Sequence, residues 1–386
     1  MSQFPVLKIL YNRVMRKKLL SVCCILVFLY FGFVKQEYAQ QKPPQSSIRI
    51  EGVVVRVLEN SQIIEDSGNK HSYQKLELLG TSGSFKGKTF QIENGKYDQS
   101  GIIDYKKGDK VVLNVTKDQS GKDDFTITDY VRRTPLLILF LIFVGLAALV
   151  GGKRGLTSII GMVLTFGVLF VIVLPQVLKG FNPVAATVLA SFVIIPVTFC
   201  LSHGINKKTL CAIAGTFISL FLTGLLAYVF VDASHLTGYA SEEASYLNVG
   251  RNGAIDIHGL LLAGLIIGLL GILQDITISQ AAVVCQLKNA NDKLKFYSLF
   301  SRAMDVGRDH IASMSNTLIL VYAGVSLPLL LLFLTNPLPF SAVINFEIIA
   351  EEVVRTLVSS IGLILAVPIT TALTVLVVET TSKKKA

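Results

Sequence analysis

The chain has 386 residues, of which 52% are hydrophobic and 16% are charged, and its formal net charge at pH 7 is +10. A soluble chain of this length carries more charge and breaks its apolar runs sooner. The composition therefore excludes an ordinary soluble domain and indicates an integral membrane protein whose main partner is the lipid bilayer.

Long apolar runs recur along the chain, and each comes near the roughly 20 residues that a helix needs to cross hydrocarbon. The predicted spans are residues 19–34, 136–150, 156–174, 184–201, 210–231, 259–273, 317–334 and 357–378. The fold class expected is an α-helical polytopic membrane protein with about eight transmembrane helices.

The first run has two interpretations. It follows the basic residues Arg16, Lys17 and Lys18, which is also how a secretory signal begins. The sequence Glu37-Tyr38-Ala39 after it is a poor cleavage site, so an uncleaved anchor is favoured over a cleaved signal.

Lysine and arginine positions predict the orientation. With the N terminus inside, the short outer loops hold only Lys179, Arg251 and Arg355, and the other basic residues outside the segment 35–133 fall on the inner side. The positive-inside rule then places both termini in the cytoplasm. The net positive charge is explained by this topology and implies no nucleic-acid partner.

Between the first two spans the periodicity becomes alternating, which predicts an extracytoplasmic β domain. The expected strands are residues 48–57, 73–79, 89–93, 111–116 and 125–129. Five short strands with Gly-rich turns predict a small all-β barrel of the OB kind. Its aromatic residues are scattered at strand positions, so core packing is favoured over ligand binding for Tyr73, Phe85, Phe90, Tyr97, Tyr105, Phe125 and Tyr130.

Several short motifs together carry a family resemblance. They are a Gly-x-Phe-Lys-Gly-Lys turn at residues 83–88, a Lys-Gly-Asp-Lys turn at 107–110, Gly-Arg-Asp at 307–309, and Ser-Asn-Thr-Leu-Ile-Leu-x-Tyr-x-Gly at 315–324. With one anchor and an outer β domain, the chain resembles the YibE/F-like family of multipass bacterial membrane proteins over nearly its whole length. The resemblance implies an architecture in the bacterial cell membrane and supplies no reaction.

The expected layout divides the chain into five parts. They are a cytoplasmic basic segment (1–18), a transmembrane anchor (19–35), an extracytoplasmic β domain (36–133), a seven-helix membrane domain (134–379) with a cytoplasmic segment near 280–312, and a cytoplasmic basic tail (380–386).

Asp275 is the leading candidate for an ion or substrate site, because a charged residue within a span is costly and usually functional. It follows the apolar run 259–273 and precedes the apolar residues around 276–284. Either it lies at depth in a long or broken helix, or the span ends at Leu273 and Asp275 lies at the wet inner boundary. Both interpretations stay open.

A second candidate group lies between residues 305 and 317. Helical spacing lets Arg308 pair with Asp305, and it places Asp309, Asn316 and Thr317 on one polar stripe that enters the next span. A capped helix entrance with an interfacial salt bridge explains the charged part. The amide of Asn316 needs a partner within the bundle, and Asp275 is the expected partner.

Three prolines interrupt apolar spans and are candidates for helix breaks, which often line transport sites: Pro196, Pro328 and Pro368. They are also tolerated as ordinary kinks. On the outer side, a weak His and carboxylate set is a candidate for a divalent metal ion, with interface polarity as the alternative: Asp232, His235, Asp256 and His258.

The chain has no Gly-x-x-x-x-Gly-Lys-Ser/Thr phosphate loop, no His-Glu-x-x-His and no Gly-x-Ser-x-Gly. The preferred hypothesis is a secondary transporter or channel-like permease for an ion or small solute, with no cofactor. The alternatives are a structural or regulatory component whose outer domain binds a protein partner and, last, an intramembrane enzyme. The sequence does not indicate an oligomeric state.

Overall fold

The computed structural model describes residues 48–64, 70–95, 103–117, 123–250, 255–335 and 338–383. The expected first span and the basic segment before it lie outside these residues. The chain divides into two compact units, with the boundary after Leu146. One unit is built around a β-sheet and the other around a helical bundle.

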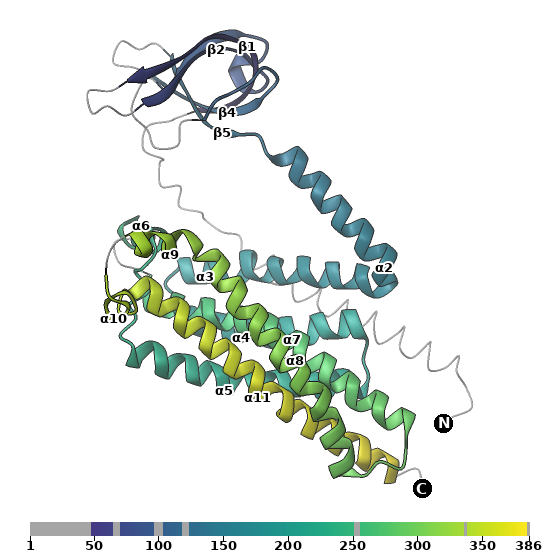
Figure 1. Cartoon of the computed structure of the whole chain (residues 1–386). Coiled ribbons are helices and arrows are strands. Elements are labelled where there is room, and N and C mark those ends of the chain that lie inside the picture. Colours follow the sequence, from purple (N-terminus) through teal and green to yellow (C-terminus); the bar gives the residue numbers. More distant parts are fainter. Residues whose placement is uncertain are drawn as a thin grey trace. The chain divides into compact units, whose positions relative to one another are not determined.

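The first unit is a curled antiparallel sheet of five strands (Figure 1). The strands are β1 (Ile48–Ile64), β2 (Lys70–Gly80), β3 (Thr89–Asn94), β4 (Lys110–Lys117) and β5 (Asp123–Tyr130). Their order in the sheet is β3-β2-β1-β4-β5, and a short 3-10 helix (Gly83–Phe85) lies between β2 and β3. All five expected strands are present, and β1 is longer than expected because its pairing with β2 continues as far as Ile64.

The core of this unit forms from side chains that alternate along the strands, as the pleat requires. Val54, Leu76, Leu78 and Leu113 are fully buried there. The edge strands β3 and β5 also meet, because the rings of Phe90 and Phe125 stack with their centroids 4.4 Å apart. Core packing, the favoured interpretation of the scattered aromatics, is confirmed for five of the six described members of the set: Phe85, Phe90, Tyr105, Phe125 and Tyr130 pack in this cluster, and Tyr73 does not belong to it.

The turn after β2 has the backbone that its glycines permit. Gly83 and Gly87 have φ values of 68° and 81°, a region that residues with a Cβ rarely adopt. Between them Phe85 turns inward, and its ring lies 5.1 Å from that of Phe125. The Gly-x-Phe-Lys-Gly-Lys motif is therefore a turn that places one aromatic ring in the core.

Because the sheet has its own core, we expect residues 47–132 to fold when expressed without the helices. Circular dichroism should show β structure with a cooperative thermal transition. Leu76→Ala should lower the unfolding free energy by about 2–5 kcal/mol because it leaves a cavity. Ile48→Ala, at a position 53% exposed, is the control and should change it little. A disordered fragment would show that another part of the protein completes the core.

The second unit is helical and begins within α2. Its helices are α2 (Arg133–Val168), α3 (Leu174–Leu178), α4 (Pro183–His203), α5 (Lys207–Ala233), α6 (Glu242–Gly250), α7 (Ile257–Ala290), α8 (Phe296–Val325), α9 (Leu327–Thr335), α10 (Phe340–Val343) and α11 (Glu347–Lys383). The helices α5, α7 and α11 pack against one another, and α4 and α8 pack against α7 (Figure 1). Leu269, Leu273 and Leu363 are completely buried in this core.

Five helical stretches among the described residues are long and apolar enough to cross a membrane, or six if α8 and α9, which bend by 62°, form one span. The expected count of about eight is not confirmed. One stretch, Arg133–Leu178, has 46 residues and would be about 69 Å long if straight, more than twice the thickness of hydrocarbon. It contains two of the expected spans, and α2 is non-helical at Gly152, between them, where φ is 54° and ψ is −138°.

Candidate functional site

A polar cleft of about 260 Å³ opens between α2, α4 and α7. Its charged and titratable lining residues are Arg154, His203 and Asp275, one from each of the three helices. Hydroxyl and amide side chains line the rest of its polar surface: Ser158, Thr165, Thr198, Ser202 and Gln274. The structure thus gathers polar groups from three separate parts of the sequence around the leading candidate residue.

Asp275 lies on α7 next to a residue that ties this helix to α4. The neighbouring Gln274 donates a hydrogen bond from Nε2 to the Thr198 hydroxyl at 2.9 Å, which ties α7 to α4. Thr198 in turn donates to the backbone oxygen of Ile194 at 2.7 Å. Among the described residues, the Asp275 carboxylate itself has no hydrogen-bond or ion-pair partner, so it is available to a ligand or to water in the cleft.

The second candidate group lies elsewhere. Asp305 and Arg308 form the expected ion pair along α8, 2.6 Å apart and both well exposed. Asp309, Asn316 and Thr317 are also exposed on α8. In the part of the chain that the structure describes, Asn316 and Asp275 form no hydrogen bond, so the expected contact between them is not found.

A buried polar seam that the sequence did not reveal joins the central helices. The hydroxyls of Thr216 on α5 and Thr277 on α7 lie 2.7 Å apart. Gln280, fully buried on α7, donates from Nε2 to the backbone oxygen of Ala303 on α8 and to the Thr371 hydroxyl on α11, both at 2.8 Å. One amide therefore connects three helices. Only the recurrence of Thr and Gln within apolar runs hinted at this seam.

The seam requires close backbone approach at one position of α8. A Cβ at Gly307 would lie 2.5 Å from the Val367 side chain and 3.0 Å from Nε2 of Gln280. The glycine of the Gly-Arg-Asp motif is thus a packing residue, which allows α8 to sit against both α7 and α11.

We expect Gly307→Ala to destabilise the bundle by about 1–3 kcal/mol, because the added methyl group overpacks a closed contact. Gly264→Ala on α7 is the matched control, since a Cβ there meets nothing within 4 Å and alanine favours helix. Thermal unfolding in detergent measures both variants. A midpoint for Gly307→Ala equal to or above that of Gly264→Ala would contradict the close packing.

The three candidate prolines differ in what they do. Pro328 lies next to the 62° bend between α8 and α9. Pro196 and Pro368 lie inside α4 and α11, and both helices continue through them. These two prolines therefore do not divide their helices. The cleft around Asp275 lies between packed helices and is not formed by a break at a proline.

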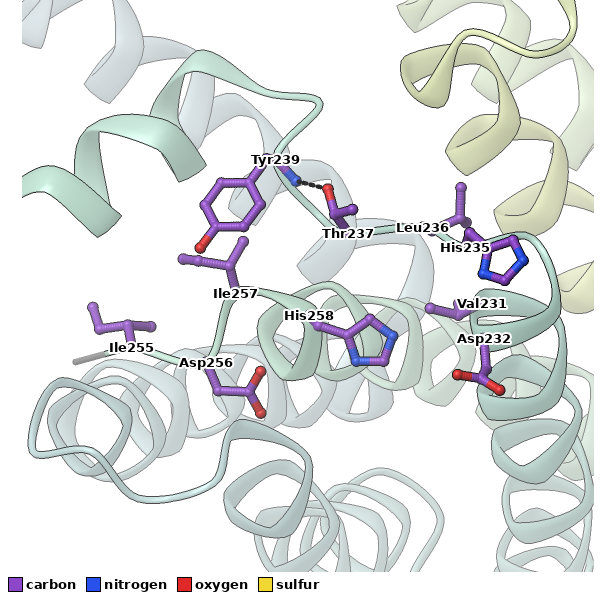
Figure 2. A pocket seen from close by; sticks show the side chains of 10 residues that line it. All are labelled: Val231, Asp232, His235, Leu236, Thr237, Tyr239, Ile255, Asp256, Ile257 and His258. Carbon is purple, nitrogen blue, oxygen red and sulfur yellow. Dashed lines mark hydrogen bonds between the residues drawn. The ribbon is translucent and has the colours of Figure 1, made fainter. Parts of the chain in front are cut away.

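The candidate His and carboxylate set lines one cavity of about 550 Å³. Figure 2 shows Asp232 and His235 coming from the end of α5 and the turn after it, and Asp256 and His258 from the start of α7. Asp256 caps α7 by accepting a hydrogen bond from the Gly259 backbone N–H at 2.8 Å. Within the described ranges, no group of three or more His, Cys, Asp or Glu side chains could hold a metal ion.

Long apolar helices, a polar cleft among them and a separate β-sheet unit are the features of a multipass membrane protein. A model of the YibE/F-like protein family matches residues 139–380, and one of the YibE/F family N-terminal domain matches residues 49–130. The chain therefore belongs to the YibE/F-like family, as the sequence motifs indicated. Comparison with curated proteins and with solved structures gave no match.

Proposed function

We propose that the protein is a permease that carries an ion or a small solute across the bacterial cell membrane, and that the cleft around Asp275 is its binding site. The observation that carries the proposal is that the Asp275 carboxylate has no partner among the described residues and lines a polar cleft between helices apolar enough to cross a membrane. A charged side chain at the centre of a membrane helix costs about 2.5–3.5 kcal/mol in insertion experiments, and ionisable residues within spans usually mark ion or substrate pathways.

The length of α4 supports a position for Asp275 inside the hydrocarbon. α4 has 21 residues, about 31 Å, which matches the thickness of the hydrocarbon core. Its Thr198 lies five residues before the end at His203 and contacts Gln274. Asp275 is then about 7 Å inside the boundary, deep enough to be desolvated and close enough to exchange a ligand with the aqueous side.

The proposal predicts that Asp275→Asn abolishes flux while leaving folding near normal, because the amide keeps the shape of the side chain and removes its charge. Asp292→Asn is the matched control, since Asp292 is an exposed carboxylate just after α7 and does not line the cleft. Purified variants are reconstituted in liposomes, and proton and monovalent-cation flux is followed with entrapped dyes before a screen of small solutes.

Three results would count against the proposal. Equal flux in wild type and Asp275→Asn would show that the carboxylate is not needed for flux. Equal loss of flux in Asp292→Asn would show a general effect of charge. Wild-type protein that moves none of the solutes would favour the alternative, in which the membrane helices support a β domain that binds a protein partner. The far part of the β1–β2 hairpin suits the binding of a protein partner, because the apolar side chains of Leu58 and Ile63 are exposed there.

We further propose a topology of eight spans, with both termini in the cytoplasm and residues 36–133 outside as an OB-like barrel. Three basic residues support it, because they lie at positions that the topology assigns to the inner side: Lys153 follows the non-helical Gly152 in α2, Lys207 begins α5 and Lys288 lies in the last turn of α7. The strand order and the contact between β3 and β5 support the barrel.

Reporter fusions test this topology. A fusion at Gly95 should be active only with an extracytoplasmic reporter and one at Lys385 only with a cytoplasmic reporter, because inner loops carry the basic residues. A fusion at Gly180, in the short turn between α3 and α4, should report the outer side if residues 133–178 cross the membrane twice. A cytoplasmic Gly95 would overturn the assignment of every later loop.

A further inference from the structure

One face of α8 is polar over three turns, and the described residues leave it uncovered. Asp305, Arg308, Asp309, Ser313 and Asn316 recur at helical spacing on it, and all five are exposed. The opposite face holds Leu299, Ala303 and Gly307, which are buried against the bundle. We call the exposed set the α8 stripe. It points away from the helices that the bundle packs together.

Contacts along α7 place the upper end of the α8 stripe near the middle of the bilayer. Gln280 contacts Ala303, and it lies six residues, about 9 Å, beyond Gln274 along α7. Gln274 contacts Thr198, which lies five residues before the end of α4. Gln280 and Ala303 therefore lie at about the depth of the end of α4. Asn316 lies 13 residues after Ala303 on α8. It is therefore about 18 Å from the end of α4, within a hydrocarbon core of about 31 Å.

An amide at this depth needs a partner, because lipid offers no hydrogen bonds. Asn316 has no hydrogen-bond partner among the described residues. In the remaining apolar segments of this chain, residues 136–150 are entirely apolar, and residues 19–34 contain the hydroxyls of Ser21 and Tyr30 but no amide, carboxylate or basic side chain. An amide of a second molecule would satisfy both the donor and the acceptor groups of Asn316.

We propose that a second copy of this chain covers the α8 stripe and that the protein is a homodimer with α8 at its two-fold interface. Two copies inserted in the same orientation are related by an axis normal to the membrane, so equivalent residues of the two α8 helices face each other at one depth. An amide both donates and accepts, so Asn316 is complementary to the same residue of a second copy. Small residues beside it, Ala312 and Ser313, let the helices approach closely.

The charges of the α8 stripe are also self-complementary. Arg308 lies between Asp305 and Asp309, one turn apart, and its guanidinium has five donors of which the Asp305 pair uses a part. Asp309 has no ion-pair partner among the described residues. Across a two-fold axis, Arg308 of each copy can reach Asp309 of the other, which offsets the repulsion between the two facing arginines.

Sedimentation of the full chain in mild detergent tests the proposal. Wild type should sediment as a dimer, and Asn316→Leu should weaken the dimer roughly tenfold, since an interhelical hydrogen bond in a membrane contributes about 0.6–1.7 kcal/mol and each dimer loses a reciprocal pair. Phe221→Leu on α5, at a position 71% exposed and remote from the α8 stripe, is the control and should leave the dimer unchanged.

Cysteine cross-linking in native membranes gives a second measurement that detergent does not disturb. In a cysteine-free background, Asn316→Cys and Ser313→Cys should form dimers on mild oxidation, and Phe221→Cys should not. A monomeric wild type would overturn the proposal. It would also be overturned if Phe221→Cys cross-linked as strongly as Asn316→Cys, which would indicate random collision.

Discussion

The structure of the helical unit depends on one constraint: hydrocarbon contains no water to satisfy a polar group, so each such group needs a partner in protein. Gln280 shows how the constraint shapes the bundle. Its amide is completely buried and donates to both α8 and α11, and Gly307 keeps α8 close enough for these bonds to form. The polar seam thus fixes the positions of helices whose apolar surfaces alone would allow many arrangements.

Asp275 and Asn316 lie outside the seam and have no such partner among the described residues, and they differ in their surroundings. Asp275 lines an open cleft between α2, α4 and α7 that has room for a ligand. Asn316 lies on an uncovered face of α8 where nothing in the described chain meets it. The first arrangement suits a small molecule or ion that enters and leaves. The second suits a permanent neighbour of matching shape and charge.

Local features were predictable from the sequence where a short pattern determines them. Alternation gave the five strands, and Gly83 and Gly87 marked a turn whose positive φ values need glycine. Helical spacing gave the Asp305–Arg308 pair. The contact expected between Asp275 and Asn316 failed because it depends on the depth at which the two helices place these residues and on how each helix is rotated about its own axis. That rotation is set by the pairing of Gln280 with Ala303 and Thr371, residues far apart in the sequence.

The two proposed sites lie on different sides of α7, and this separation has a consequence for how the protein would work. The cleft is formed by α2, α4 and α7, whereas the α8 stripe belongs to a helix that packs on α7 and α11. A dimer made through α8 would leave each cleft complete within its own chain. Each copy would then carry its own pathway, and the dimer interface would contribute no residue to the cleft. Within each copy, the contact of Gly307 with Gln280 holds α8 against α7.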